Sequence, residues 1–507
     1  MFHVLYSSVT RNSSFGEVVM IRVLFGLIAL ILILSAGAMG TVSEETQACL
    51  DCHSLYTPGI VEDWLSSRHS NVTVDQALEL PRIERRVTNE NVSEVLRSVS
   101  IGCYECHTLN TDKHQDSFEH FDYKINLIVS PNDCATCHSE EVSQYTGSKK
   151  AHALGNLQDN ELFSLMVSTH TSVKNVSETE IGQLEASENA KNESCYACHG
   201  TEVIVRGLRT VETDLGDIEV LDLDNWPNQG VGRVNPDGSL GACTSCHPRH
   251  SFSIEIARKP YTCSQCHLEP DVPAWQVYKE SKHGNIFSSI GSKWEWNSVP
   301  WVLGKDFKAP SCAVCHNSLV VNSEGDEILP RTHDFGARIW QRIFGLIYSH
   351  PQTISGQTSI IRNSDSQPLP TTFDGEIAAE YLISEQEQQS RQDDMKSLCR
   401  NCHGRTWADE YFVKFDSTVT EADMMVASAT RLIMAAWELN LEDKSNPFDE
   451  TIEFRWVRQW LFYANSLRYA SAMSGPDYAA FKNGWWSLTE NLQLMKDFIE
   501  QKQALRR

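Results

Sequence analysis

The sequence has no cysteine outside one short motif. All 16 cysteines lie in the pattern Cys-x-x-Cys-His, which occurs eight times. A disulfide framework usually pairs distant cysteines and makes no demand for histidine, and a zinc ribbon combines two Cys-x-x-Cys pairs into one site of four ligands. A histidine directly after the second cysteine of every copy argues against both classes.

This motif is the attachment signature of c-type haem. Its two thiols add across the vinyl groups of one porphyrin, and the adjacent imidazole becomes the proximal ligand of the iron. Eight copies therefore predict eight c-type haems and a role in electron transfer. The attachment residues are Cys49, Cys52, His53; Cys103, Cys106, His107; Cys134, Cys137, His138; Cys195, Cys198, His199; Cys243, Cys246, His247; Cys263, Cys266, His267; Cys312, Cys315, His316; and Cys399, Cys402, His403.

Basic residues are scarce relative to acidic ones. Lys and Arg number 43 against 67 Asp and Glu, which gives a formal net charge of −24. Such a charge argues against nucleic acid or an anionic membrane surface as the partner. We interpret it as a solvated acidic surface that leaves room for a basic redox partner, such as a cytochrome or a quinone-linked protein.

The apolar run Val23–Leu34 is short for a membrane span. It has 12 residues, whereas a spanning helix needs about 20. Arg22 precedes the run and small residues follow it, as in a secretory signal. We therefore expect residues 1–40 to be a signal peptide, with Met20 as the more natural start. Export to the periplasm, or to the extracellular face of the cytoplasmic membrane, agrees with the attachment of haem c outside the cytoplasm.

The fold is expected to be mainly α, with few strands and a core packed with haem. Residues 41–403 carry the motifs and form the expected octahaem domain. Residues 404–507 have no cysteine, and apolar residues at three- and four-residue spacing predict helices over 421–439, 451–473 and 485–505. We expect these long C-terminal helices to pack as a core and to contribute to oligomerisation.

The histidines outside the motifs decide between two kinds of protein. Eight distal histidine ligands would make every iron six-coordinate, as in an electron wire, whereas seven would leave one iron open to a small molecule. The count alone leaves both alternatives open. The candidates in the mature chain are His69, His114, His120, His152, His170, His250, His283, His333 and His350.

Several stretches around the motifs have a distinctive local sequence. They are Pro58–Trp64 leading to Ser67–His69, Trp226–Arg233 running through Asn235–Leu240, Pro248–Phe252, and Ser281–Gly284. With these stretches the chain resembles the octahaem hydroxylamine oxidoreductase family. The similarity covers most of residues 45–490 and is most specific over 226–284.

The resemblance implies that the fourth haem, at Cys195–His199, has an open iron and is catalytic. The other seven haems would then be bis-histidine electron carriers. His114 and His170 would be spare. The distal ligands implied are His69, His120, His152, His250, His283, His333 and His350.

Two family features near the catalytic haem are matched in part. An Asp-His pair after the sixth motif, which moves protons in the family, reads Asp271-Val272 here, and a valine cannot carry a proton. A tyrosine that in oxidising members reaches from a neighbouring subunit and bonds covalently to the haem corresponds to Tyr478. The resemblance also implies a homotrimer.

Three functions remain open from the sequence. The first is oxidation of hydroxylamine or hydrazine at the fourth haem, which a cross-link through Tyr478 favours. The second is reduction of nitrite or hydroxylamine toward ammonia at the same iron. Asp271 would accept a proton from bound hydroxylamine in the first function and deliver one to a bound N-oxide in the second. The third is a non-catalytic electron conduit, which needs an eighth distal ligand such as His114 or His170.

Overall fold

The computed structural model describes residues 41–506, apart from residues 179, 214–215 and 343–349. The expected signal segment within residues 1–40, including Met20, lies outside the described residues. Among the helices of the described part, none is both long enough and apolar enough to cross a membrane.

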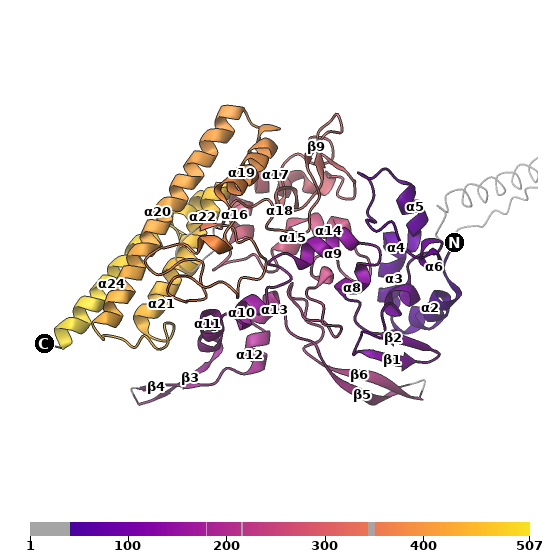
Figure 1. The fold of residues 1–507 in the computed structure, drawn as a ribbon, viewed down its shortest axis with the longest axis horizontal. Coiled ribbons are helices and arrows are strands. Elements are labelled where there is room, and N and C mark those ends of the chain that lie inside the picture. The colour runs from indigo at the N-terminus through magenta and orange to yellow at the C-terminus, as the bar shows by residue number, and fades with distance from the viewer. Residues whose placement is uncertain (1–40, 179, 214–215, 343–349, 507) are drawn as a thin grey trace, which may run out of the picture.

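The region that carries the motifs is built from short helices and long loops (Figure 1). Motifs such as Cys103–His107 and Cys195–His199 are themselves single helical turns, which place the two cysteines on one face because they are three residues apart. The α-helices are α2 (Glu44–Tyr56), α3 (Pro58–Ser66), α4 (Arg68–Asn71), α5 (Val74–Glu79), α6 (Glu94–Arg97), α7 (Cys103–His107), α8 (Pro131–Cys134), α9 (Ser139–Thr146), α10 (Gly155–Gln158), α11 (Glu161–Thr171), α12 (Glu188–Asn192), α13 (Cys195–His199), α14 (Ile254–Arg258), α15 (Pro260–Cys263), α16 (Ala274–Glu280), α17 (Lys282–Ile290), α18 (Cys312–His316) and α19 (Glu385–Arg400). Short 3₁₀ turns are η1 (Cys243–Ser245), η2 (Gly291–Lys293) and η3 (Ala379–Tyr381).

The strands form small sheets at the edges of the helical body. Four are antiparallel hairpins, and one sheet has three strands in the order β7-β8-β9. The β3–β4 and β5–β6 hairpins extend away from the body (Figure 1). The strands are β1 (Ser117–His120), β2 (Tyr123–Asn126), β3 (Val173–Ser177), β4 (Glu180–Leu184), β5 (Ile204–Thr213), β6 (Gly216–Asp224), β7 (Trp301–Val302), β8 (Val320–Val321), β9 (Glu327–Leu329), β10 (Gln341–Arg342) and β11 (His350–Pro351). The fold is thus mainly α, as expected from the sequence.

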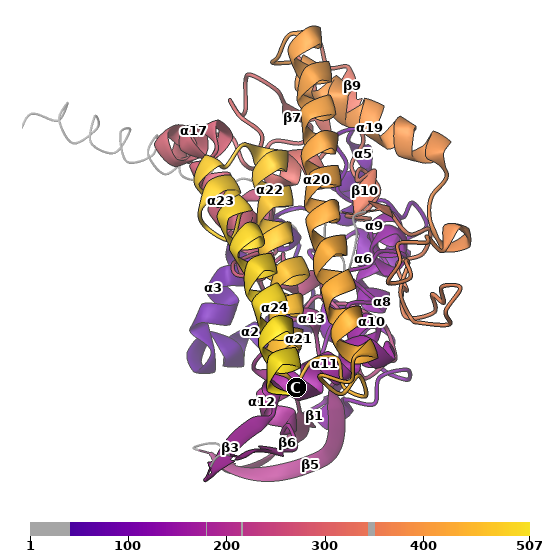
Figure 2. The ribbon, with the colours of Figure 1, turned by 90° about the vertical axis from the view of Figure 1, so that its left-hand side faces the viewer.

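Long helices close the chain and pack side by side (Figure 2). They are α20 (Arg405–Glu438), α21 (Thr451–Val457), α22 (Ala464–Met473), α23 (Pro476–Ala480) and α24 (Trp485–Leu505), with the π-helical segment η4 (Arg458–Tyr463) between α21 and α22.

Helix α20 begins well before the expected residue 421. The buried residues Ala408, Phe412, Phe415 and Val419 continue its apolar face at three- and four-residue spacing back to the first turn. Gly404 precedes the helix in an extended conformation. The apolar face of the first four turns is broad enough to need a partner, and the haem-bearing region supplies it.

The core of this region contains Trp456, Trp460, Phe448 and Ile433, all fully buried. Trp456 and Trp460 of the segment 451–473 thus take part in packing. Interior side chains are packed at nearly crystal density, so that even the loss of one methylene is felt.

Replacing Ile433 with valine is expected to lower the stability of the loaded protein by about 1 kcal/mol, since the site is fully buried and closes only partly over the gap. The thermal unfolding midpoint measures this. Val413→Ala on the same helix is the matched control, because Val413 is 71% exposed and its loss of apolar volume opens no cavity. Equal midpoints for the two variants would contradict the assignment of Ile433 to the core.

Candidate functional site

One large cavity runs through the part of the chain that carries the motifs. Its volume is about 3320 Å³, several times the roughly 300–1,000 Å³ of an ordinary small-molecule pocket. All eight motif histidines line it, as does every motif cysteine except Cys52. The 16 cysteines form no disulfide bonds. These walls fit a set of large apolar macrocycles attached through thiols.

The motif histidines present one ring nitrogen to this cavity. The Nδ1 atom of His107 is 2.8 Å from the carbonyl oxygen of Asn126, and that of His199 is 3.1 Å from the carbonyl oxygen of Ala153. Such a hydrogen bond fixes the tautomer and leaves Nε2 free to bind iron. Burial lowers the pKa of both imidazoles, which keeps them neutral and able to act as ligands.

Three motif histidines face a second histidine across the cavity. The distances between ring centres are 6.2 Å for His53 and His120, 6.2 Å for His138 and His69, and 6.1 Å for His403 and His283. A metal–nitrogen bond is about 2 Å long, so two imidazoles on opposite sides of one iron have their centres about 6 Å apart. Each pair therefore has the spacing of two axial ligands.

Two further expected ligands lie near motif histidines. Burial, followed by repulsion from His107, lowers the pKa of His250 to about 4. Burial, followed by repulsion from His247, lowers the pKa of His333 to about 4. Both imidazoles are thus neutral at physiological pH and within electrostatic reach of a proximal ligand.

The sixth motif has a different neighbour. The Nζ atom of Lys150 lies 3.1 Å from Nε2 of His267. Lys150 lines the cavity, whereas His152, the histidine expected as a ligand in this segment, is not among the described residues that line it. The side chain of His350 lies outside the described part of the chain.

Thiols of different motifs lie close enough to shift one another's pKa, and these pairs show which motifs are neighbours in space. The motif at Cys195–His199 adjoins the sixth motif in this way, and the remaining contacts join the first motif to the second, the third to the fifth and the sixth to the seventh. The pairs in contact are Cys49 with Cys103, Cys134 with Cys243, Cys198 with Cys266 and Cys263 with Cys312.

The fourth motif faces a polar corner of the cavity formed by Asp271 and Tyr469. Asp271 is close enough to His199 to influence the pKa of its imidazole. Burial raises the pKa of the Asp271 carboxyl, so that it holds a proton more readily than an exposed aspartate. Burial also raises the pKa of Tyr469, and the charge of Asp271 adds to this effect. Val272 lines the cavity beside them and has no proton to give.

Tyr478 is held inside its own subunit. It is 2% exposed, and its hydroxyl donates a hydrogen bond of 2.6 Å to Oε2 of Glu269. It is not among the described residues that line the cavity. In this conformation the hydroxyl is engaged within the chain.

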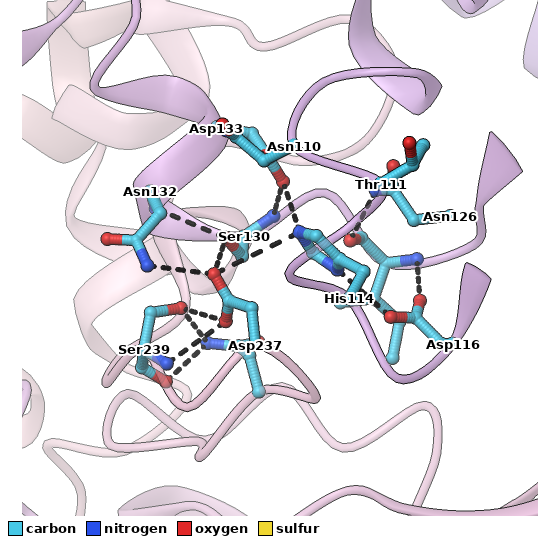
Figure 3. Close-up of polar contacts among 12 residues, drawn as sticks. Asn110, Thr111, His114, Asp116, Asn126, Ser130, Asn132, Asp133, Asp237 and Ser239 are labelled. Carbon is cyan, nitrogen blue, oxygen red and sulfur yellow. Dashed lines mark hydrogen bonds and ion pairs between the residues drawn. The ribbon is translucent and has the colours of Figure 1, made fainter.

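His114 is the centre of a buried ion-pair cluster (Figure 3). Its Nδ1 lies 2.9 Å from Asp116, and its Nε2 lies 3.1 Å from Asp133 and 3.9 Å from Asp237. Both ring nitrogens therefore face carboxylates and neither is left for iron. His170, the other spare histidine, lies on the cavity wall.

Comparisons with known proteins agree with this geometry. A family model described as "Seven times multi-haem cytochrome CxxCH" matches residues 237–326, and one described as "Cytochrome c554 and c-prime" matches residues 133–215. A solved "Hypothetical multiheme protein" is 40% identical with a TM-score of 0.87, covering 94% of this chain and 99% of its own.

Two further relatives come from Kuenenia stuttgartiensis. A "Probable nitrite reductase-hydroxylamine oxidoreductase fusion protein" is 23% identical over 77% of this chain, which spans only 38% of that relative's length. The solved "reducing HAO-like protein complex Kustc0457/Kustc0458" is 17% identical with a TM-score of 0.58, covering 91% of this chain and 86% of its own. At 17% identity, the likeness to this complex shows a shared fold only.

The chain is a multihaem c-type cytochrome, and it is similar to proteins of the hydroxylamine oxidoreductase kind. The cytochrome is therefore a redox protein with c-type haem iron as its cofactor.

Its cysteines and motif histidines were evident from the sequence, because the motif is contiguous. Two residues of the cavity were missed. Tyr469 falls in the segment 451–473, which the sequence predicts as a helix of the core, and Lys150 is not a histidine, the residue type that the sequence offers as distal ligand.

Proposed function

We propose that this cytochrome reduces nitrite or hydroxylamine toward ammonia at the haem of Cys195–His199. The other seven motifs hold haems that deliver the electrons. The observation that carries the proposal is the polar corner at the fourth motif, where Asp271 and Tyr469 face the cavity beside His199.

The position of Tyr478 favours reduction over oxidation. The oxidative direction rests on a tyrosine that leaves its own subunit and bonds to a neighbour's haem. Here the hydroxyl of Tyr478 is buried and bound to Glu269. Without the cross-link, the fourth haem keeps the chemistry of an ordinary macrocycle.

Protons for the reduction come from the two residues of the polar corner. Burial raises the pKa of Asp271, so its carboxyl holds a proton more readily than an exposed aspartate and is suited to give one to the nitrogen or oxygen of a bound substrate. The loss of the family histidine at Val272 leaves Asp271 as the nearest acid, with Tyr469 beside it. Reduction of hydroxylamine consumes a pair of protons with a pair of electrons and breaks the N–O bond, giving ammonia and water.

An open haem iron supplies the place where a small nitrogen compound binds and accepts electrons. The contact of Cys198 with Cys266 supports a route for these electrons through the sixth haem.

The ion-pair cluster around His114 weighs against the non-catalytic conduit, because it removes one of the two spare ligands. The solved Kuenenia complex, which is named as a reducing one, points in the same direction.

Assembly and location remain part of the proposal. A homotrimer would use exposed apolar surface, and the β3–β4 hairpin offers Val176 and Ile181, which are 71% and 73% exposed. The electron donor is a cytochrome or a quinone-linked protein outside the cytoplasm.

The deciding experiment uses the loaded protein. Electron paramagnetic resonance of the oxidised form is expected to show one high-spin haem among low-spin ones, and nitrite or hydroxylamine is expected to change that signal alone. With a reduced viologen as donor, ammonia should form from both compounds. A protein that has only low-spin haems and forms no ammonia would contradict the proposal. A protein that oxidises hydroxylamine and reduces neither compound would support the oxidative function instead.

A further inference from the structure

The chain repeats one short pattern three times: a buried aromatic residue, then a buried serine three positions later, then a basic residue, then a cavity residue. The aromatic residues are 5 to 6% exposed and the serines 1 to 3%. The copies are Trp64, Ser67, Arg68 and His69; Tyr145, Ser148, Lys149 and Lys150; and Tyr278, Ser281, Lys282 and His283.

The three copies also share their backbone geometry. In each, the serine N–H donates to the carbonyl of the aromatic residue, at 2.9 Å for Ser67, 2.9 Å for Ser148 and 3.0 Å for Ser281. In each, the serine hydroxyl then accepts from a backbone N–H two or three residues later, at 3.3, 3.3 and 3.0 Å respectively. Ser67 and Ser281 directly follow the last residues of α3 and α16, whereas Ser148 lies in the turn that follows α9. In all three copies the residue two positions after the serine lines the cavity.

In two copies this residue is a histidine that faces a motif histidine. His69 lies opposite His138 and His283 opposite His403, at ring-centre distances of 6.2 and 6.1 Å. In the third copy the same position holds Lys150. Its Nζ lies 3.1 Å from Nε2 of His267, the nitrogen of the sixth motif that binds iron.

We propose that the amine of Lys150 is the sixth ligand of the haem at Cys263–His267, in place of His152. This inference rests on the haem loading proposed above but not on the direction of the reaction. On binding, the ammonium releases one proton to solvent and its nitrogen lone pair forms the bond to iron, with no change of oxidation state. Because two metal–nitrogen bonds in line need about 4 Å between the nitrogens, the flexible lysine side chain withdraws by about 1 Å from its present contact.

Lysine at this place has a consequence for electron flow. The axial ligand is one of the main determinants of a haem's reduction potential. The sixth motif adjoins the fourth through Cys266 and Cys198. The lysine-ligated haem is therefore the one that passes electrons to the reaction centre, and it differs in ligand from the haems that have two histidine ligands.

The test compares variants of the full, loaded protein. Near-infrared magnetic circular dichroism distinguishes amine–imidazole from bis-imidazole haem, and electron paramagnetic resonance counts high-spin irons. Wild type is expected to show one amine–imidazole haem. In Lys150→Ala that signature is lost and the high-spin signal about doubles, and in Lys150→His the low-spin count is restored with bis-imidazole character.

Control variants and a haem assay show whether the spectral changes are specific to Lys150. His152→Ala is expected to leave both spectra unchanged, and so is Lys149→Ala, which alters the adjacent lysine. A haemochrome assay shows that each variant retains its full haem content, and Lys150→His demonstrates folding if Lys150→Ala is unstable.

A bis-imidazole spectrum in wild type, or a high-spin gain in His152→Ala but not in Lys150→Ala, would overturn the assignment. The first of these outcomes places Lys150 beside the haem as a countercharge only. The high-spin signal of the fourth haem is identified separately by its response to added nitrite. A failure of the proposed function is thereby distinguished from a failure of this inference.

Discussion

Replacing Asp271 with asparagine is expected to slow the reduction of hydroxylamine and nitrite by about 100-fold, the lower end of what a positioned proton donor contributes. The carboxyl of Asp271 has a raised pKa because it is buried, and it lies beside His199 on the cavity wall. Asparagine keeps the shape of the side chain but cannot release a proton to the substrate. Turnover with a reduced viologen, measured as ammonia formed, gives the effect.

Two control variants show whether Asp271 acts as a proton donor. Asp217→Asn removes an exposed carboxylate from strand β6 and should leave the rate unchanged. Tyr469→Phe removes the second hydroxyl of the polar corner and should slow the reaction less than Asp271→Asn. An unaltered high-spin signal in Asp271→Asn shows that the haem pocket is intact. A rate within a factor of two of wild type would assign proton delivery to another group.

Replacing His114 with leucine is expected to destabilise the protein by about 3–5 kcal/mol, because it removes one partner of a buried charge cluster. Asp116 and Asp133 would be left without their counter-ion at a site where the side chains are fully buried. The thermal midpoint of the loaded protein measures the loss. Adding Asp116→Asn to His114→Leu should recover part of it, and a double variant that is no more stable than the single one would contradict this account.

The same cluster predicts how stability depends on pH. Burial lowers the pKa of His114, but its contacts with Asp116 and Asp133 outweigh burial and raise it to about 10, above its ordinary value of 6.5. A raised pKa in the folded state contributes stability that is fully present below about pH 6.5 and is lost as the pH rises toward 10. Wild type should therefore lose stability over this range more steeply than His114→Leu. Parallel pH profiles for the two proteins would show that His114 does not carry the charge.

The sequence predicted the features that are contiguous along the chain. The motif residues and the mainly α fold follow from short-range pattern, as does the start of α24 at Trp485. The start of α20 at Arg405 did not follow, because its early apolar residues gain meaning only from the surface that they pack against. His69 and His120 were selected as ligands by their local sequence, and their partners could be known only from the folded chain.

The residues of the polar corner likewise could not be grouped from the sequence alone. Tyr469 had the spacing of a core residue on a helix, and only the three-dimensional arrangement brings it beside Asp271. Lys150 had a usable signal, since it stands two residues after a serine just as His69 and His283 do. That signal was overlooked because lysine was not considered as an iron ligand.

The first and the last motif are the most exposed of the eight. Cys52 in the first motif and Cys402 in the last are the two exposed cysteines, whereas the others are at least partly covered. Helix α2, which contains the first motif, and helix α19, in which the last motif begins, lie far apart in both views (Figures 1 and 2). The fourth motif adjoins the sixth motif, which comes between the first and the last along the chain. We therefore expect the loaded protein to exchange electrons at both of these places, with the proposed reaction centre lying off the path between them.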